Sequence, residues 1–368
     1  MNILLTGGAG FIGSHTAVEL IEAGHTPIIV DSLVNSDPEV YKNLKKITNS
    51  DVIHYENDCR DTAKMVRIMK KHKCQAVIHF AAYKAVGESV ATPLKYYTNN
   101  LDSLTSILDA MELASVNEFI FSSSCTIYGD PKKLPITEKS PIQPATNPYG
   151  ATKQMAERII EDVCASSSIR AVMLRYFNPI GAHPSSHIGE LPIGTPNCLV
   201  PYLTQATAQL RDPLTVYGDD YDTPDGSAIR DYIHVVDLAK AHVKSMDYLK
   251  TSHKDVSVFN IGTGTGTSVL EVIDKFQKVT GEQVPYRVGP RREGDVAQTY
   301  ASPKLAQRVL GWSAEKSIDE ALLDAWNWQL ELAKKPHNIL ERAEEMVEHA
   351  ETAIEETIRE SWGMAADA

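Results

Sequence analysis

A glycine-rich turn near the start of the chain constrains the fold more than any other feature. Residues 2–6 form an apolar run typical of a buried strand, and residues 11–24 have a helical pattern. Three glycines, Gly7, Gly8 and Gly10, stand between these two segments, and a fourth, Gly13, lies at the start of the second. Their spacings, G-x-x-G-x-x-G and G-x-G-x-x-G, allow a tight turn and a close approach of a pyrophosphate to the helix N-terminus. A purely structural turn is the alternative.

The same alternation of strand and helix continues through the first half of the chain. Nearly continuous apolar runs, typical of strands buried on both faces of a parallel sheet, occupy residues 27–31, 76–81, 118–123 and 171–176. Helical patterns occupy the gaps at residues 62–72, 99–115 and 149–166. This order predicts an α/β fold with a Rossmann-like, doubly wound parallel sheet.

The second half predicts a smaller, mixed α/β domain and a helical extension. Prolines punctuate the chain from Asn178 to Arg230, whereas a helical stretch near 236–250 and a strand at 256–262 return to the first domain. Ser268 and Glu271 predict a capping box that opens a further helix. The expected division is a dinucleotide-binding domain (1–177 and 236–262), a substrate domain (178–235 and 263–335) and an acidic helical tail (336–368).

The tail has a helical stripe of apolar residues, and we favour packing on the parent chain over docking on a partner helix. Charge restricts the partners of the whole chain. It has 36 basic and 48 acidic residues, a net charge of −12, which disfavours nucleic acid and anionic membranes as main partners. No apolar run approaches the roughly 18 residues of a membrane helix.

The five scattered cysteines include no C-x-x-C pair and are typical of reduced thiols, so we expect a cytoplasmic protein without disulfides. His183 and His187 flank Pro184 without a neighbouring carboxylate, so no metal site is expected.

An acidic residue at the end of the second strand indicates which dinucleotide binds. Asp31 lies 18 residues after Gly13, where a carboxylate accepts hydrogen bonds from the adenosine ribose. It would repel a 2′-phosphate, and residues 32–36 contain no arginine to bind one. The sequence therefore favours NAD over NADP as the cofactor.

A tyrosine, a lysine and a serine form the candidate catalytic group. Tyr149 and Lys153 share one face of a predicted helix, and Ser124 leaves the carboxyl end of a predicted strand. Free tyrosine, with a pKa near 10, is a poor base at neutral pH, but Lys153 and a cationic nicotinamide would favour the phenolate. The phenolate could take a hydroxyl proton, with Ser124 as relay, while hydride leaves the same carbon. Ser124 acting only as a cap at the strand end is the alternative.

The glycine turn, Ser124 and Tyr149-x-x-x-Lys153 together resemble the extended short-chain dehydrogenase/reductases. Longer stretches are similar to the UDP-glucose 4-epimerase family, and the resemblance runs from residue 1 to about 333. These stretches are Ile78–Ser89, Leu174–Pro184, Arg230–Val235 and Pro290–Asp295.

The resemblance implies roles for individual residues. The expected contacts with tightly bound NAD are Gly7, Gly10, Phe11, Ile12, Gly13, Asp31, Asn35, Ser36, Asp58, Cys59, Phe80, Ala81, Ala82, Lys84, Asn99 and Phe177, beside the catalytic three. The expected contacts with the UDP-sugar are Asn178, Cys198, Leu199, Tyr217, Arg230, Arg292, Asp295 and Thr299. The arginines are suited to a diphosphate because the guanidinium fork matches phosphate oxygens.

Two positions depart from the family pattern. Cys198 stands where a second Asn is usual, which puts one substrate hydrogen bond in doubt. Thr299 stands where strict glucose/galactose epimerases often have a bulky Tyr, so we hypothesise that N-acetylated UDP-sugars are also accepted.

The resemblance implies an isomerase that reversibly inverts C4 of a UDP-hexose through a transient 4-keto sugar, and a homodimer. The nearest rival, a nucleotide-sugar 4,6-dehydratase, would have Thr-Asp-Glu where this chain has Ser124-Cys125-Thr126. A non-catalytic NAD-binding scaffold is the rival from another class, and it would not explain the intact catalytic group.

Overall fold

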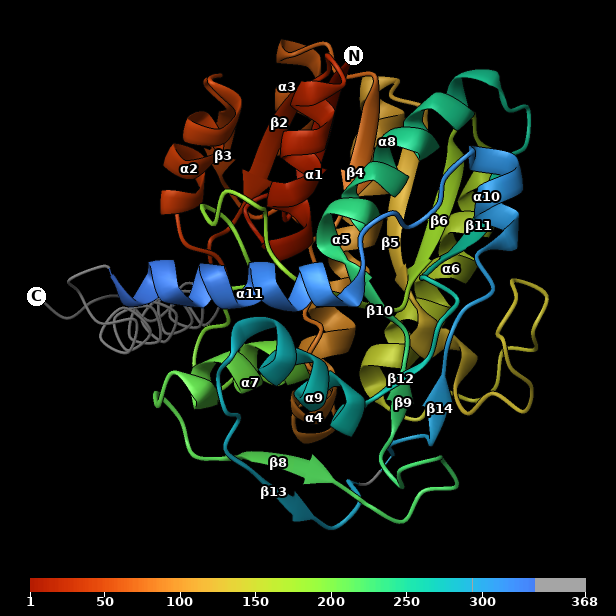
Figure 1. The fold of residues 1–368 in the computed structure, drawn as a ribbon. Coiled ribbons are helices and arrows are strands. Elements are labelled where there is room, and N and C mark those ends of the chain that lie inside the picture. The colour runs from red at the N-terminus through yellow and green to blue at the C-terminus, as the bar shows by residue number, and fades with distance from the viewer. Residues whose placement is uncertain (293, 335–368) are drawn as a thin grey trace, which may run out of the picture.

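The structure is a computed structural model that describes residues 1–292 and 294–334, so the predicted tail at 336–368 lies outside the described residues. Its centre is a sheet of seven strands in the order β11-β6-β5-β4-β1-β2-β3 (Figure 1). Every neighbouring pair in this sheet is parallel. The strands are β1 (Asn2–Thr6), β2 (Thr26–Asp31), β3 (Ile53–Glu56), β4 (Ala76–His79), β5 (Glu118–Ser124), β6 (Arg170–Tyr176) and β11 (Val256–Ile261).

Helices cover both faces of this sheet, and the strands supply side chains to both. Ile3 and Leu5 of β1 pack in one core with residues of α1 and α8, which lie on the near face in Figure 1. Leu4 points the opposite way, into a core shared with α3, α5 and α6. This arrangement confirms the predicted doubly wound α/β sheet. The helices on the first face are α1 (Phe11–Glu22), α2 (Glu39–Thr48), α8 (Val235–Thr251) and α10 (Lys304–Leu310); those on the second are α3 (Thr62–Lys71), α5 (Pro93–Ala114) and α6 (Pro148–Ser166).

The remaining elements, apart from the short helices α4 (Val86–Ala91) and η1 (Cys125–Tyr128), form a second lobe, below the sheet in Figure 1, with a core of its own that includes Val200, Phe276 and Trp326. Its strands pair in small groups, β10 with β7, β9 with β12 and β14, and β8 with β13. These strands are β7 (Asn178–Ile180), β8 (Leu214–Tyr217), β9 (Ile229–Arg230), β10 (Tyr232–His234), β12 (Thr267–Ser268), β13 (Tyr286–Gly289) and β14 (Gln298–Thr299). The helices are α7 (Leu199–Thr207), α9 (Val269–Thr280) and α11 (Ile318–Ala333), and the predicted capping box of Ser268 and Glu271 opens α9.

The chain passes repeatedly between the sheet and the second lobe. β6 leads directly to β7, β10 leads directly to α8, and β11 returns to the sheet beside β6. The chain then runs to β12 and α9, comes back for α10, and ends its described part in α11. Consequently, the carboxyl ends of the central strands lie next to the lobe, where ligand sites of such sheets form.

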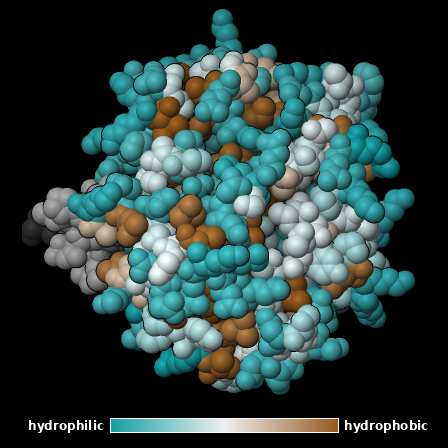
Figure 2. Space-filling view, viewed as in Figure 1, coloured by the Kyte–Doolittle hydropathy of each residue, from teal (hydrophilic) through white to brown (hydrophobic). Residues whose placement is uncertain are grey.

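The surface on the side viewed in Figure 1 is mainly hydrophilic. Apolar residues appear there in small, separate groups (Figure 2). Among the described residues, no helix is both long enough and apolar enough to span a membrane.

Candidate active site

The glycine turn between β1 and α1 is packed too tightly for side chains. Gly7 has a positive φ of 67°, and a Cβ on it would lie 2.8 Å from the backbone nitrogen of Ala81, which follows β4. A Cβ on Gly13 would lie only 2.4 Å from the carbonyl oxygen of Gly7. Gly10 is the N-cap residue of α1, so the first amide groups of the helix face the turn without a side chain between them. This cradle fits a pyrophosphate.

Asp31, the last residue of β2, closes one side of the turn. Its Oδ2 accepts a hydrogen bond from the backbone nitrogen of Ala9 and its Oδ1 from that of Leu33, each at 2.9 Å. Burial raises the pKa of this carboxyl, while the two backbone hydrogen bonds lower it. The side chain is therefore held beside the glycines, as a contact with an adenosine ribose requires.

The other residues expected to contact NAD follow the ends of neighbouring strands. Phe11 and Ile12 begin α1, Asn35 and Ser36 follow β2, Asp58 and Cys59 follow β3, and Phe80, Ala81, Ala82 and Lys84 follow β4; Phe177 follows β6, and Asn99 lies in α5. Because carboxyl ends of parallel strands share one edge, the structure brings these segments to one side of the sheet.

Tyr149 and Ser124 meet at the same edge. Tyr149 is the second residue of α6, Ser124 is the last residue of β5, and their side chains are hydrogen-bonded to each other. The Ser124 hydroxyl also accepts hydrogen bonds from the backbone nitrogen (3.2 Å) and hydroxyl (2.9 Å) of Thr126. Ser124 therefore also acts as a cap, because its side chain caps the short 3-10 helix η1 (Cys125–Tyr128).

The positive charge that lowers the pKa of the Tyr149 phenol is that of Lys84, which the sequence predicts only as a contact with NAD. Burial raises the pKa of Tyr149 to about 12, whereas the hydrogen bond with Ser124 and the charge of Lys84 lower it. Lys153 Nζ lies 5.9 Å from the centre of the Tyr149 ring and donates a 2.6 Å hydrogen bond to the carbonyl of Ser122. Burial lowers the pKa of Lys153 to about 8, and Glu157 opposes that shift. The assignment of Lys153 as the group that lowers the Tyr149 pKa stays a prediction.

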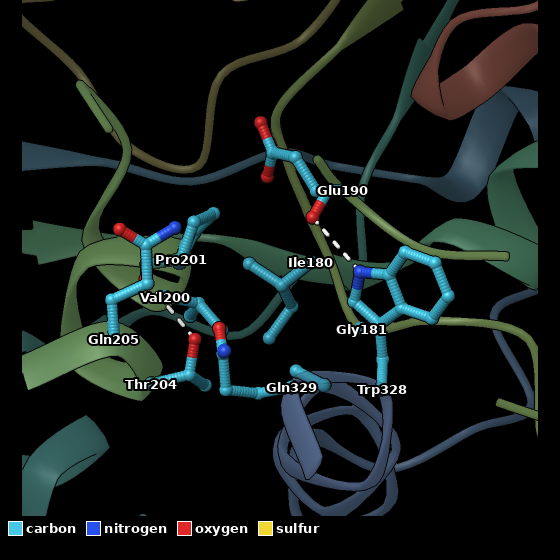
Figure 3. A pocket seen from close by; sticks show the side chains of 10 residues that line it. Ile180, Gly181, Glu190, Val200, Pro201, Thr204, Gln205, Trp328 and Gln329 are labelled. Carbon is cyan, nitrogen blue, oxygen red and sulfur yellow. Dashed lines mark hydrogen bonds between the residues drawn. The ribbon is translucent and has the colours of Figure 1, made fainter. Parts of the chain in front are cut away.

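Glu190, on the loop before α7, is a site residue that sequence reasoning missed. Its carboxylate accepts a 2.7 Å hydrogen bond from Lys84 Nζ and hydrogen-bonds the thiol of Cys198, the N-cap residue of α7. Its backbone carbonyl accepts a 3.0 Å hydrogen bond from the Trp328 indole, beside a pocket between α7 and α11 (Figure 3). No periodic pattern marks this loop, so only tertiary contacts reveal the residue.

The residues expected to bind the UDP group gather around one carboxylate in the second lobe. Asp295 accepts a 2.9 Å hydrogen bond from Arg292, and its Oδ1 lies 3.9 Å from Nη2 of Arg230. The Arg292 guanidinium lies over the ring of Tyr217, 5.6 Å from its centre. Thr299 is paired with Arg230 between β14 and β9 and is buried. Two cations and an aromatic ring are suited to a nucleoside diphosphate.

Two further expected substrate residues are the first residues of elements of the second lobe. Asn178 begins β7, and its buried Oδ1 has no hydrogen-bond partner among the described residues. Leu199 begins α7, directly after Cys198.

Across residues 1–292 and 294–334, no three His, Cys, Asp or Glu side chains are grouped closely enough to hold a metal ion.

Comparisons with known proteins identify the family. A family model described as GDP-mannose 4,6 dehydratase matches residues 4–324. The UDP-glucose 4-epimerase of Bacillus subtilis is 49% identical over 330 residues, covering 89% of this chain and 97% of that protein. The human UDP-glucose 4-epimerase is 47% identical over 334 residues, covering 89% and 96%. The chain belongs to the UDP-glucose 4-epimerase family.

Solved epimerase structures agree with this assignment. The epimerase of Bifidobacterium longum, in complex with NAD+ and UDP, is 48% identical with a TM-score of 0.87, covering 90% of this chain and 98% of that one. The epimerase of Stenotrophomonas maltophila, with bound NAD and formylated UDP-arabinopyranose, is 45% identical with a TM-score of 0.89, covering 91% and 99%. The family predicted from the sequence is confirmed, whereas the individual site residues stay predictions.

Proposed function

We propose that this chain interconverts UDP-glucose and UDP-galactose by NAD-dependent inversion at C4. The observation that carries the proposal is the position of Tyr149 and Ser124 at the carboxyl end of β5 in a chain that belongs to the epimerase family. The glycine cradle and Asp31 lie along the same edge of the sheet, and the cations Arg230 and Arg292 lie in the adjoining lobe.

The central sheet and the helices that cover it form the cofactor side of the site. A Cβ at Gly7 or Gly13 would fill the turn, and Asp31 is fixed beside it, so the residues present fit NAD. Relatives of 45–48% identity were solved with NAD bound. We assign residues 1–177 and 236–262 to this domain and residues 178–235 and 263–335 to the substrate domain, with the exception that α10 of the latter range packs on the sheet. Bound NAD supplies a hydride acceptor for C4 of the sugar and a cationic ring beside the phenol.

The chain's own residues supply the proton chemistry. Tyr149 as phenolate removes the proton of the 4-hydroxyl, with Ser124 hydrogen-bonded to the same oxygen as relay. Lys84 favours the phenolate by its charge, and Lys153 supports the same form from the next turn of α6. Because a buried phenol favours its neutral form, both cations are needed at neutral pH.

Arg230 and Arg292 allow inversion at one carbon. By holding the diphosphate, they let the transient 4-keto sugar turn about that link and present its other face without leaving the site. Arg292 already donates hydrogen bonds to a negative partner, the Asp295 carboxylate, and Arg230 Nη2 lies 3.9 Å from the same group, which supports anion binding at this position. Asn178, Cys198, Leu199 and Tyr217 complete the proposed UDP-sugar contacts.

Thr299 favours a wider choice of sugar. The residue is buried in β14, in the proposed substrate domain, and threonine is smaller than the tyrosine usual in strict epimerases, so it would leave room beside the sugar 2-position. We therefore extend the proposal to UDP-GlcNAc and UDP-GalNAc. Thr299→Tyr is expected to reduce turnover of UDP-GlcNAc relative to UDP-glucose, and an unchanged ratio would contradict this extension.

Exposed apolar side chains support a homodimer, and free cysteines support a location in the cytoplasm. Exposed apolar side chains lie on the adjacent helices α5 and α6, where Leu94 is 78% and Met155 is 46% exposed. Such side chains suit an interface between two copies of this helix pair. The five cysteines are free thiols in the structure, in keeping with a reducing compartment.

One assay tests the reaction. The purified protein is incubated without added NAD with UDP-galactose or UDP-GalNAc, and the sugar nucleotides are separated and quantified. We expect the C4 epimers to form without build-up of free NADH, and Tyr149→Phe to abolish turnover. A dehydrated 4-keto-6-deoxy product would favour the dehydratase alternative, and complete inactivity of the wild type would favour the scaffold.

A further inference from the structure

A buried carboxylate lies directly behind the catalytic group. Glu157 belongs to α6, one turn after Lys153, and it is not among the site residues expected from the sequence. Its Oε1 accepts hydrogen bonds from Ser123 Oγ at 2.5 Å and from Arg175 Nε at 2.9 Å, and its Oε2 accepts one from Arg175 Nη2 at 2.6 Å. The Glu157 and Arg175 side chains are each only 6% exposed.

Three residues of one helix face meet the last three residues of β5. Tyr149, Lys153 and Glu157 are spaced four residues apart on α6, so they lie on the same face. Tyr149 is hydrogen-bonded to the Ser124 side chain, Lys153 to the Ser122 carbonyl, and Glu157 to the Ser123 hydroxyl. Glu157 is therefore the third attachment between the catalytic helix and the catalytic strand end.

Glu157 also provides the negative charge that faces Lys153. The buried ammonium lies over the Phe121 ring, with Nζ 4.7 Å from its centre, a contact that favours the cation. Burial away from water has the opposite and larger effect and disfavours the charged form. The titratable groups that face Lys153 are Glu157 and Tyr149 from α6 and His79 from β4. His79 is neutral at physiological pH because burial lowers its pKa to about 3. Glu157 thus supplies the negative charge that favours the charged form of Lys153, while Arg175 pairs with the same carboxylate.

Arg175 fixes this carboxylate from the neighbouring strand. Arg175 lies in β6, and its Nε and Nη2 donate to the two carboxylate oxygens of Glu157. Its Nη1 donates a 2.8 Å hydrogen bond to the hydroxyl of Tyr128 in η1. That hydroxyl donates at 2.7 Å to Asn260 of β11. A buried ion pair is often no more stabilising than an apolar pair of the same size, so stability alone does not account for this arrangement.

We propose that Glu157, held by Ser123 and Arg175, is a positioning residue of the proposed epimerisation: it keeps Lys153 charged and holds Tyr149 against Ser124. Glu157 does not touch the substrate. Its effect on the reaction passes through Lys153 and through the contact between α6 and β5. The inference rests on the proposed function for its consequence in catalysis, whereas the effect on Lys153 can be measured on its own.

Glu157→Gln tests the charge, and Ser123→Ala is the matched control. The glutamine retains the shape of Glu157 and loses its charge, while the control loses one hydrogen bond and retains the charge. Lys153 is followed by NMR on protein carrying 15Nζ-lysine, with its signal identified by its loss in Lys153→Arg. We expect the Lys153 titration to move to lower pH in Glu157→Gln and to stay in place in Ser123→Ala.

The kinetics give the second readout. Glu157→Gln is expected to reduce kcat for UDP-galactose by tenfold or more with less than a twofold change in KM, and to move the alkaline limb of the pH profile to lower pH. Glu157→Asp, which restores the charge, should recover part of kcat. An unmoved Lys153 titration together with a wild-type pH profile in folded Glu157→Gln would overturn the proposal.

A double variant covers the case in which Glu157→Gln does not fold. Glu157→Gln with Arg175→Met removes both charges and leaves neither partner buried alone, so we expect it to fold. It should still show the lowered Lys153 titration and the reduced kcat, and wild-type values of both would refute the proposal. An inactive wild type would instead count against the proposed function, and the Lys153 titration would still decide the role of Glu157.

Discussion

Gly13→Ala is the sharpest steric test of the cofactor cradle. The new Cβ would lie 2.4 Å from the Gly7 carbonyl oxygen and 2.6 Å from Gly8 Cα, whereas an ordinary contact begins at 3.4 Å. Both neighbours are backbone atoms, so the turn itself must move by about 1 Å, and overpacking of this kind costs ~1–3 kcal/mol. In a chain of 368 residues the unfolding entropy is roughly 0.8 kcal/mol/K, so 1 kcal/mol corresponds to roughly 1.3 °C and Tm should fall by about 1–4 °C.

The same displacement should weaken NAD binding, because the Gly7 carbonyl moves into the turn that the pyrophosphate must approach. A loss of ~1.4 kcal/mol or more in binding corresponds to at least a tenfold weaker affinity. Tm is measured by calorimetry with and without added NAD, and bound nucleotide is quantified after purification. Gly87→Ala is the control, since nothing lies within 4 Å of its Cβ, and Tm should be unchanged or slightly higher. Wild-type Tm and full NAD content in Gly13→Ala would refute the reasoning.

Three further predictions concern charge. Lys84→Met removes the cation that lowers the Tyr149 pKa, so the acidic limb of the kcat profile should move to higher pH, whereas Lys84→Arg should retain its position. Arg292→Lys should raise KM for UDP-galactose about tenfold, ~1.4 kcal/mol, with little change in kcat, whereas Arg291→Lys, which alters a pair with Asp220, should not. Finally, burial lowers the pKa of His15, His79 and His242 to between about 3 and 4. These rings are neutral in the folded protein and bind protons in the unfolded chain. The free energy of unfolding should therefore fall as pH decreases below about 6.5, by up to ~1.4 kcal/mol per pH unit for each histidine. Urea titrations from pH 7 to 5 measure the slope, which His242→Gln should make shallower.

The central sheet could be predicted from the sequence because its strands are buried on both faces. Such strands have continuous apolar runs, and the predicted bounds of β1 agree with the structure. The exception is β3, an edge strand of four residues, Ile53–Glu56, whose side chains are half-buried or exposed. It has no apolar run to detect, and its place in the sheet depends on pairing with β2.

The catalytic group could be predicted because its members lie at fixed points of regular elements, a strand end and the first turns of a helix. The contacts between loops could not. Lys84 and Glu190 are 106 residues apart, and neither lies in a helix or strand. No local pattern relates two such residues, so the electrostatic surroundings of Tyr149 follow only from the tertiary structure.

The repeated passage of the chain between sheet and second lobe restricts how the enzyme can open. Two lobes joined by a single linker can open by a hinge motion of that linker. Here the connections at β6–β7, β10–α8 and β11–β12 would all have to bend together, along with the segments on either side of α10. Entry and exit of a nucleotide sugar should therefore depend on small adjustments of loops and side chains, and the mouth of the site should keep nearly the same width throughout turnover.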